Sequence, residues 1–375
     1  RQLTPEWWAL VRHAMNEAKR MGLQIAMHAS DGFALAGGPW ITPELSMQKI
    51  VWTEKHIEGG AEIDVQLDQP ETIENYYRDI AVFAYPAPED AGKNSFVIKP
   101  SVTTSISGAA AQYLAEKENK RSFGSDKPCW IQYAFDEPFT VRSITIRPAS
   151  NNHQSRRLEI AVSDDGRNFR SLGRLEPPRY GWQDWDADLT YAIEPVKAKY
   201  FRFVYNPAGT EPGAEDLDAA KWKANLRITG IELSGAPKIH QYEGKTGAVW
   251  RIAKWTTAQQ IPDELCPSID EIVDLTGAMD SLGRLTWNAP KGNWTILRIG
   301  HTSTGHTNYT GGGGLGLECD KFNPEAVRLQ FENWYGAAIK QAGPELAREA
   351  LKIFHVDSWE CGSQNWSPVF RDEFI

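Results

Sequence analysis

The chain has little cysteine, no long apolar run and no excess of positive charge. Its four cysteines, Cys129, Cys266, Cys319 and Cys361, form no Cys-x-x-Cys pair, which argues against a structural zinc site. No apolar run reaches the roughly 18 residues of a membrane-spanning helix. The net charge is −9, and no basic stripe that would bind nucleic acid is visible. These absences favour a protein that acts on neither nucleic acid nor the membrane interior.

Two catalytic motifs are also missing. The glycine run 311–314 lacks the Gly-Lys-Ser/Thr ending of a phosphate-binding loop. His28, Ser30 and Asp31 lie together, but the Gly-x-Ser-x-Gly turn of a serine hydrolase is absent. No signal peptide is visible at Arg1, where the sequence opens in the middle of a pattern. We therefore look for chemistry of another kind.

Aromatic residues are abundant, with fifteen Trp and twelve Tyr. Flat aromatic rings stack on sugar faces, but they also fill protein cores. The enrichment is a weak indication of carbohydrate binding.

Helix and strand alternate at both ends of the chain. Thr4 and Pro5 begin a helix that Gly22 ends, and the apolar run 23–27 predicts a buried strand. Thr42-Pro43-Glu44 predicts a second helix through Met47, Ile50 and Val51. Towards the other end, Asn323-Pro324-Glu325 begins a helix with one face formed by Val327, Phe331, Trp334 and Ala338. Gly343-Pro344 breaks that helix, a short helix 345–351 follows, and 353–356 predicts a strand.

The middle of the chain is rich in strands from about residue 59 to about residue 308. Short β-rich runs separated by turn residues are typical of a β-sandwich, and they fall at 130–135, 141–147, 157–162, 200–205 and 228–233. The fold class is therefore multidomain, α/β plus all-β, with a partial (β/α) barrel interrupted by a β-sandwich and a further β-rich segment. The predicted parts are 1–58 as the first part of the barrel, 59–96 as a β-rich connection, 97–236 as the sandwich, 237–308 as a β-rich segment, and 309–375 as the continuation of the barrel.

Asp357 and Glu360 are the leading catalytic candidates. They follow the predicted strand 353–356, and a barrel strand delivers catalytic side chains at its C-terminal end. Two neighbouring carboxylates shift each other's pKa, as acid–base catalysis needs. The alternative is a solvated helix N-terminus, where acidic residues are also favoured.

Other polar residues are secondary candidates. If 317–321 is extended, Glu318 and Asp320 point to one face and suit a calcium ion or a sugar hydroxyl; the alternative is ordinary surface charge beside a flexible glycine lid. His301, His306 and His355 could act as ligands or in acid–base roles, although a lone strand histidine is more often a core residue.

Two resemblances follow from these segments. The strand at 130–135, the run Val162–Phe169, the strand at 200–203 and the run 231–235 resemble a galactose-binding-like, discoidin-type β-sandwich over 97–236. The stretches 37–44 with Met47 and 51–52, then 292–302, 316–321 and 357–360, resemble glycoside hydrolase family 106, the α-L-rhamnosidases, in order and spacing.

The second resemblance implies a catalytic (β/α) barrel with inserted β-domains that hydrolyses α-L-rhamnosides with inversion and with the help of Ca²⁺. The expected partner is a rhamnose-containing glycan of plant origin, and the expected location is the periplasm or the exterior of the cell. Glu360 matches one of two catalytic carboxylates and Asp357 its companion; substrate-binding roles are expected for Trp40, Glu318, Asp320, His301 and Trp359. The calcium ligands and the oligomeric state are left open.

An inverting glycosidase needs its acid and base about 6.5–9.5 Å apart, with a water molecule between them. The resemblance implies that the second carboxylate lies beyond Ile375. Two other functions stay open: a non-catalytic carbohydrate-binding or adhesion protein that uses the β-sandwich, and an exo-glycosidase for a different sugar.

Overall fold

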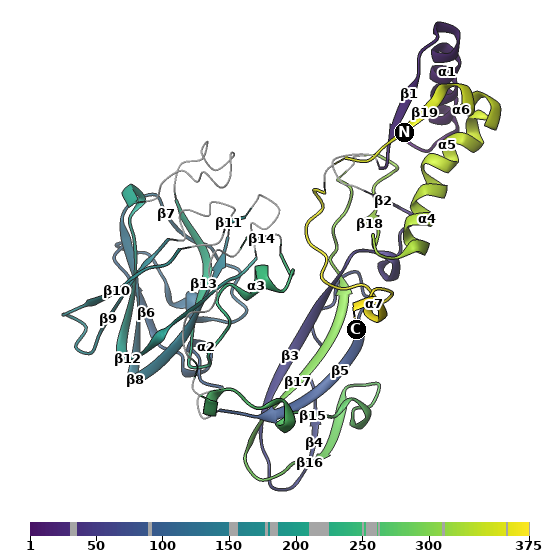
Figure 1. Cartoon of the computed structure of the whole chain (residues 1–375). Coiled ribbons are helices and arrows are strands. Elements are labelled where there is room, and N and C mark those ends of the chain that lie inside the picture. The colour runs from purple at the N-terminus through teal and green to yellow at the C-terminus, as the bar shows by residue number, and fades with distance from the viewer. Residues whose placement is uncertain are drawn as a thin grey trace.

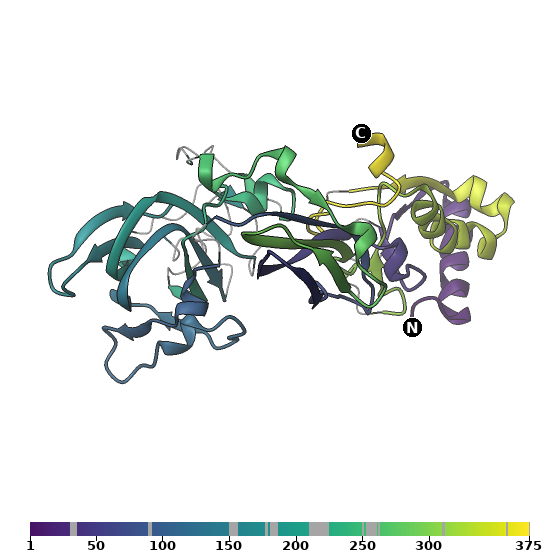
Figure 2. The ribbon, with the colours of Figure 1, turned by 90° about the horizontal axis from the view of Figure 1, so that it is seen from below.

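The computed structural model is a sheet-rich, mixed α/β protein (Figure 1). It describes residues 1–30, 36–88, 92–149, 157–176, 179–180, 187–209, 225–249, 251–252, 261, 263–309, 312–357 and 359–374. Helices gather at one end of the molecule and a large sheet at the other, with a smaller antiparallel sheet between them (Figure 2). Among the described residues, no helix is both long and apolar enough to cross a membrane.

Both ends of the chain build the helical part. The N-terminal helix α1 (Pro5–Met21) begins where predicted, because Thr4 accepts a hydrogen bond from the amide of Trp7 and Pro5 occupies the first turn. It ends at Gly22, whose φ of 66° is a left-handed conformation that favours glycine. The C-terminal elements are α4 (Pro324–Asn333), α5 (Tyr335–Ala342), α6 (Pro344–Ala350), β19 (Leu351–His355) and α7 (Arg371–Phe374).

The predicted contact between the two ends is confirmed. Strand β1 (Ile25–His28) pairs in parallel with β19, with His28 opposite His355. Helices α1, α5 and α6 enclose a common core that includes Trp8, Met15 and Ala338. The predicted face of the 323–338 helix is wrong in part. The helix α4 ends before Trp334, and the face that it buries carries Ala326 and Gln330. Val327 and Phe331 are therefore exposed.

The helix predicted through Met47, Ile50 and Val51 is also wrong. Only a 3-10 turn, η1 (Pro43–Leu45), forms, and strand β3 (Gln48–Glu58) follows it. It pairs antiparallel along the whole of β17 (Asn293–Ser303), and its β-branched residues favour a strand. The sheet order is β15-β5-β17-β3, with β5 (Arg78–Pro86) and β15 (Val273–Asp274); beside it β4 (Glu62–Gln66) pairs with β16 (Arg284–Asn288).

A seven-stranded antiparallel sheet holds the largest core of the described chain. Strands β8 and β12 form its centre, and the core includes Tyr133, Ile144, Phe201 and Leu233. As predicted, 130–135 and 157–162 pair antiparallel with 200–205 around that core. The strands are β6 (Ser101–Thr104), β7 (Phe123–Ser125), β8 (Cys129–Pro148), β9 (Glu159–Ser163), β10 (Arg170–Arg174), β12 (Leu189–Tyr205) and β13 (Leu226–Ser234).

The two runs predicted as separate strands, 130–135 and 141–147, are parts of the single strand β8. Register shifts in its pairing with β12 accommodate the charged residues between the runs. Short elements complete the fold: β11 (Arg179–Tyr180) with β14 (Arg251–Ile252), α2 (Ser95–Ile98), α3 (Tyr242–Lys245), η2 (Gln112–Ala115), η5 (Pro207–Gly209), η7 (Asp263–Leu265), η8 (Ile269–Glu271) and η9 (Thr276–Ala278).

Candidate active site

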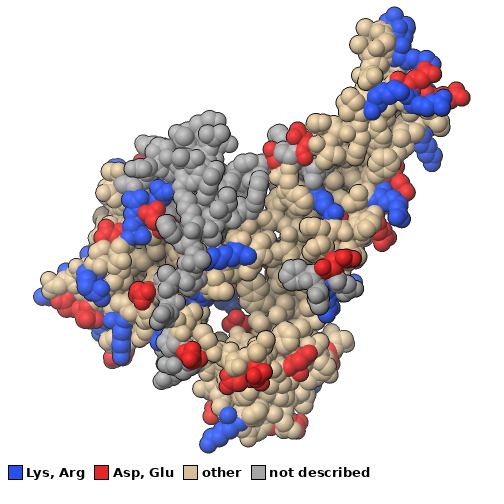
Figure 3. Space-filling model, viewed as in Figure 1, with Lys and Arg blue, Asp and Glu red and all other residues tan. Residues whose placement is uncertain are grey.

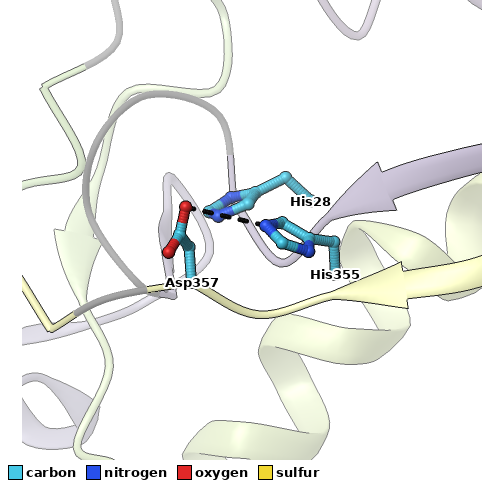
Figure 4. A group of neighbouring side chains, drawn as sticks. All are labelled: His28, His355 and Asp357. Carbon is cyan, nitrogen blue, oxygen red and sulfur yellow. Dashed lines mark ion pairs between the residues drawn. The ribbon is translucent and has the colours of Figure 1, made fainter.

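The C-terminal ends of β1 and β19 present three polar side chains to one another (Figure 4). His28 ends β1, His355 ends β19, and Asp357 follows two residues later. The His355 Nε2 and Asp357 Oδ2 atoms are 3.6 Å apart, and the two imidazole centroids are 5.3 Å apart. Asp357 is exposed and His28 is half-buried, so the group lies at the surface of this part of the chain. The predicted position of Asp357 just beyond a strand is confirmed.

Glu360 and Trp359 begin a loop, residues 359–367, that we call the site loop. Glu360 is half-buried. The Trp359 indole donates to the Gly362 carbonyl at 2.6 Å, and its ring packs with Met47 and Cys361. Further along, the site loop adds to the middle sheet: the Ile50 amide donates to Asn365 Oδ1 at 2.9 Å and the Trp366 amide to the Gln48 carbonyl at 3.3 Å.

Lys321 and Glu318 form a buried ion pair beneath the site loop. The Glu318 side chain is fully buried and that of Lys321 is 11% exposed. The ammonium lies 5.2 Å from the centre of the Trp359 ring and 3.2 Å from the Cys319 carbonyl. Burial by itself lowers the pKa of Lys321, but the interactions with Glu318, Cys361 and Cys319 together outweigh it and raise that pKa above its usual value. Lys321 therefore stays charged and connects Glu318 to the aromatic ring beside Glu360.

The two carboxylate oxygens of Glu318 differ in their contacts. Oε2 accepts from the Ala36 amide at 2.9 Å and from Lys321, while Oε1 has no hydrogen-bond partner among the described residues. A methyl group at Gly37 would meet Oε1 at 2.8 Å, so only glycine permits this close approach of β2 (Gly37–Gly38) to β18 (Leu317–Glu318). Glu318 therefore fastens the 36–38 segment to the floor of the site.

Asp320 fastens the far end of the site loop. Its Oδ1 accepts from Gln364 Nε2 at 2.6 Å and from the Phe322 amide at 3.0 Å, and its Oδ2 accepts from Ser367 Oγ at 2.5 Å. Glu318 and Asp320 are both 0% exposed. They were expected to contact substrate, but a buried side chain cannot reach a substrate at the surface unless the chain rearranges. The geometry supports positioning roles for both, and the substrate-binding roles stay predictions.

His301 is likewise an interior residue. It is 6% exposed and packs between Tyr76 and Trp366, with ring centroids 5.8 and 5.5 Å away, and Nδ1 contacts Gln48 Oε1. Burial, helped by the positive charge of Arg78, lowers the pKa of His301 to about 4. A neutral imidazole therefore supports Trp366 at neutral pH.

This burial predicts a pH-dependent stability. Because the folded pKa of His301 lies near 4 and the unfolded one near 6.5, the unfolded chain binds a proton that the folded chain rejects between these values. The buried neutral imidazole contributes about 2–3 kcal/mol to the free energy of unfolding. This contribution is complete above about pH 6.5 and is lost as the pH falls towards 4. We expect His301→Gln to lose less thermal stability than wild type between about pH 7 and about pH 4.5, while exposed His13→Gln behaves as wild type. Equal losses in all three proteins would contradict this assignment.

Trp40 is connected to the end of β1 by hydrogen bonds through one side chain, that of Gln330. Its indole donates to Gln330 Oε1 at 2.7 Å, and Gln330 Nε2 donates to the Ala29 carbonyl at 2.9 Å. Ala29 follows His28 directly, so the Trp40 ring is held beside β1 rather than free on a loop. The substrate-binding role expected for Trp40 stays a prediction.

The structure thus gathers His301, Glu318, Asp320, Trp359 and Glu360 around the site loop. Asp357 lies with His28 and His355 at the strand ends. The residues that hold these groups in place were not anticipated from sequence: Gln330, Lys321, Gln364 and Ser367. For Gln330 the sequence offered one clue, because a glutamine at helical spacing from Ala326 lies on the face that α4 buries. For Lys321 the clue was its position three residues after Glu318, a spacing at which opposite charges can pair.

The Asp, Glu, His and Cys side chains of the described residues form no all-carboxylate group that would suit calcium. Calcium takes six to eight oxygen ligands. The three-residue metal-ligand group within the described chain contains two imidazoles and one carboxylate. Both oxygens of Asp320 already accept hydrogen bonds, and Glu318 is paired with Lys321.

Comparison with known proteins gives the class to which this site belongs. A family model described as alpha-L-rhamnosidase, Glyco_hydro_106, matches residues 1–375, and carboxylates beyond a parallel strand are consistent with a glycoside hydrolase. The chain belongs to glycoside hydrolase family 106. A solved rhamnosidase from Novosphingobium sp. PP1Y is similar at 27% identity with a TM-score of 0.77, covering 100% of this chain and 35% of that one.

A curated protein of Formosa agariphila, named "Putative beta-glucuronidase", is 25% identical over 374 residues, which is 99% of this chain. The chain spans 20% of that protein and 35% of the solved rhamnosidase. The family is therefore shown along the whole chain, while both relatives are much longer.

Proposed function

We propose that this chain is part of an α-L-rhamnosidase that hydrolyses terminal α-L-rhamnosides of plant polysaccharides or glycosides with inversion. The match of the family model to residues 1–375 carries the proposal. The half-buried position of Glu360, just beyond β19, is consistent with it. The glycan is an extracellular material, which favours a periplasmic or secreted enzyme. Charges of both signs are interspersed on the face in Figure 3, as expected for a protein with no nucleic-acid partner.

Glu360 is proposed as one catalytic carboxylate and Asp357 as its companion. A carboxyl group that exchanges a proton with the glycosidic oxygen or with water needs a fixed orientation and restricted access to solvent. The ion pair under Trp359 and the hydrogen bonds of Asp320 fix the two ends of the site loop that carries Glu360. The partner carboxylate and calcium stay predictions of the family resemblance.

The fold of the whole enzyme is proposed to include a (β/α) barrel. Parallel pairing of β1 with β19, helices α1, α5 and α6 packed together, and catalytic candidates beyond the carboxyl end of β19 support this. Ile353 and Phe354 of β19 are 47% and 43% exposed, whereas parallel strands are usually covered on both faces. Further barrel strands would cover them.

The segment 97–236 is proposed as an inserted β-sandwich of galactose-binding-like type, with the other predicted boundaries unchanged. Its core is separate from those of the helical part and the middle sheet. We expect residues 97–236 expressed alone to unfold cooperatively in urea with a native near-ultraviolet dichroism spectrum. A gradual transition, or a spectrum without aromatic fine structure, would contradict an independent domain.

Initial rates on a panel of para-nitrophenyl glycosides test the activity of the full protein. The α-L-rhamnoside should be hydrolysed fastest. The β-D-glucuronide belongs in the panel because of the name of the Formosa relative. Preference for another sugar would assign the same chemistry to a different substrate. Sugar binding without hydrolysis of any member would favour the carbohydrate-binding alternative.

A further inference from the structure

The group at the ends of β1 and β19 has the composition of a metal site. His28, His355 and Asp357 each offer one ligand atom, and these atoms all lie within 4.8 Å of one another. The three side chains turn towards a common point at the strand ends (Figure 4). They come from segments more than three hundred residues apart in the sequence, so the fold itself brings them together.

One histidine has its tautomer set by the backbone. His28 Nδ1 lies 2.9 Å from the Ser30 carbonyl oxygen, whereas the Ser30 amide is 3.4 Å away. The shorter contact requires Nδ1 to carry the proton and donate it, which leaves the lone pair on Nε2. Metal-bound histidines typically donate their other ring N–H to a carbonyl in this way. The imidazole is therefore prepared to act as a neutral nitrogen ligand.

The backbone under the three residues is firmly held. The Ala29 amide donates to the His355 carbonyl at 2.8 Å, and the Trp334 indole donates to the His28 carbonyl at 2.7 Å. The two strands thus keep a fixed separation, and only the side-chain rotamers need to adjust. Ligands of one tetrahedral zinc ion lie about 3.3 Å apart, so the remaining gap is at most about 1.5 Å.

We propose that His28, His355 and Asp357 bind one first-row divalent transition-metal ion such as Zn²⁺. Two imidazoles and one carboxylate suit zinc and its neighbours, whereas calcium prefers an all-oxygen shell. His355 and Asp357 side chains are 53% and 68% exposed, which leaves room for water in the remaining position. The proposal concerns a site with two nitrogen ligands and not the calcium that the family resemblance implies, whose ligands are left open. It does not rest on the proposed hydrolysis, since binding is measured without substrate.

The test is calorimetric titration of the metal-stripped full protein with Zn²⁺, alone and with excess Ca²⁺. Co²⁺ titration adds an optical readout, because cobalt bound by nitrogen and oxygen ligands absorbs in the visible range. The variants are His28→Ala and His355→Ala. The matched control is His13→Ala, because His13 is exposed on α1, away from this group.

Wild type and His13→Ala should bind one more Zn²⁺ ion than the two site variants, or bind it with much higher affinity. Because losing an outer-shell partner already costs about 10–100-fold in metal affinity, the loss of a ligand should cost at least as much. Excess Ca²⁺ should not displace Zn²⁺. Equal zinc binding by wild type and the site variants would overturn the proposal, as would full displacement by Ca²⁺. Circular dichroism of each variant would establish that it is folded.

Discussion

Replacing Glu360 by glutamine is expected to lower the turnover of an unactivated α-L-rhamnoside by about 10²–10⁴-fold, the usual contribution of a general acid or base. Glutamine keeps the shape of the side chain but cannot exchange a proton. Trp359, Lys321 and the rest of the site loop should stay in place, so the affinity for rhamnose should change little. Turnover is measured on the full protein with a natural rhamnoside, whose poor leaving group needs protonation.

Two further variants make this experiment decisive. Glu345→Gln removes an exposed carboxylate at the start of α6 and should leave turnover unchanged. Asp357→Asn should also reduce turnover if Asp357 is the companion of Glu360. If Glu360→Gln keeps wild-type turnover while Asp357→Asn loses it, turnover depends on Asp357 and not on Glu360. If neither variant loses turnover, neither carboxylate is catalytic.

Lys321→Met is expected to lower the free energy of unfolding by about 3–5 kcal/mol, because it leaves the buried Glu318 carboxylate without its counter-charge. The pair is well shielded, with the Glu318 side chain fully buried and one oxygen already lacking a hydrogen-bond partner among the described residues. The shift in the urea midpoint, followed by tryptophan fluorescence, measures the loss.

The control is Lys340→Met, which removes an exposed lysine from α5 and should change the midpoint little. Adding Glu318→Gln to Lys321→Met should recover part of the stability, since no unpaired charge then remains. If Lys321→Met and Lys340→Met are equally stable, the ion pair does not hold the site loop.

The sequence was sufficient to predict those helix and strand positions that depend on residues close to one another in the chain. Thr4, Pro5 and Gly22 predicted the bounds of α1 because caps act over one turn. Asn323 and Pro324 predicted the start of α4. The strand before Asp357 was predicted from its apolar run, and its parallel neighbour from the helix–strand alternation at both ends.

Long-range pairing explains what the sequence did not reveal. Met47, Ile50 and Val51 fit a helical spacing, but pairing with β17 over eleven residue pairs makes the segment a strand. Glu318 and Asp320 were predicted to share one face if 317–321 is extended, but that spacing does not reveal that both side chains are buried. His28 and His355 meet only because β1 and β19 pair, and no local pattern encodes that meeting.

The central claim is that the protein carrying this chain hydrolyses α-L-rhamnosides with inversion. Proton NMR of the sugar released from para-nitrophenyl α-L-rhamnoside, recorded before the anomers equilibrate, tests it most directly. The account predicts that β-L-rhamnose is released first. Release of α-L-rhamnose first would contradict the inverting mechanism, and the absence of any released rhamnose would contradict the assignment of this activity.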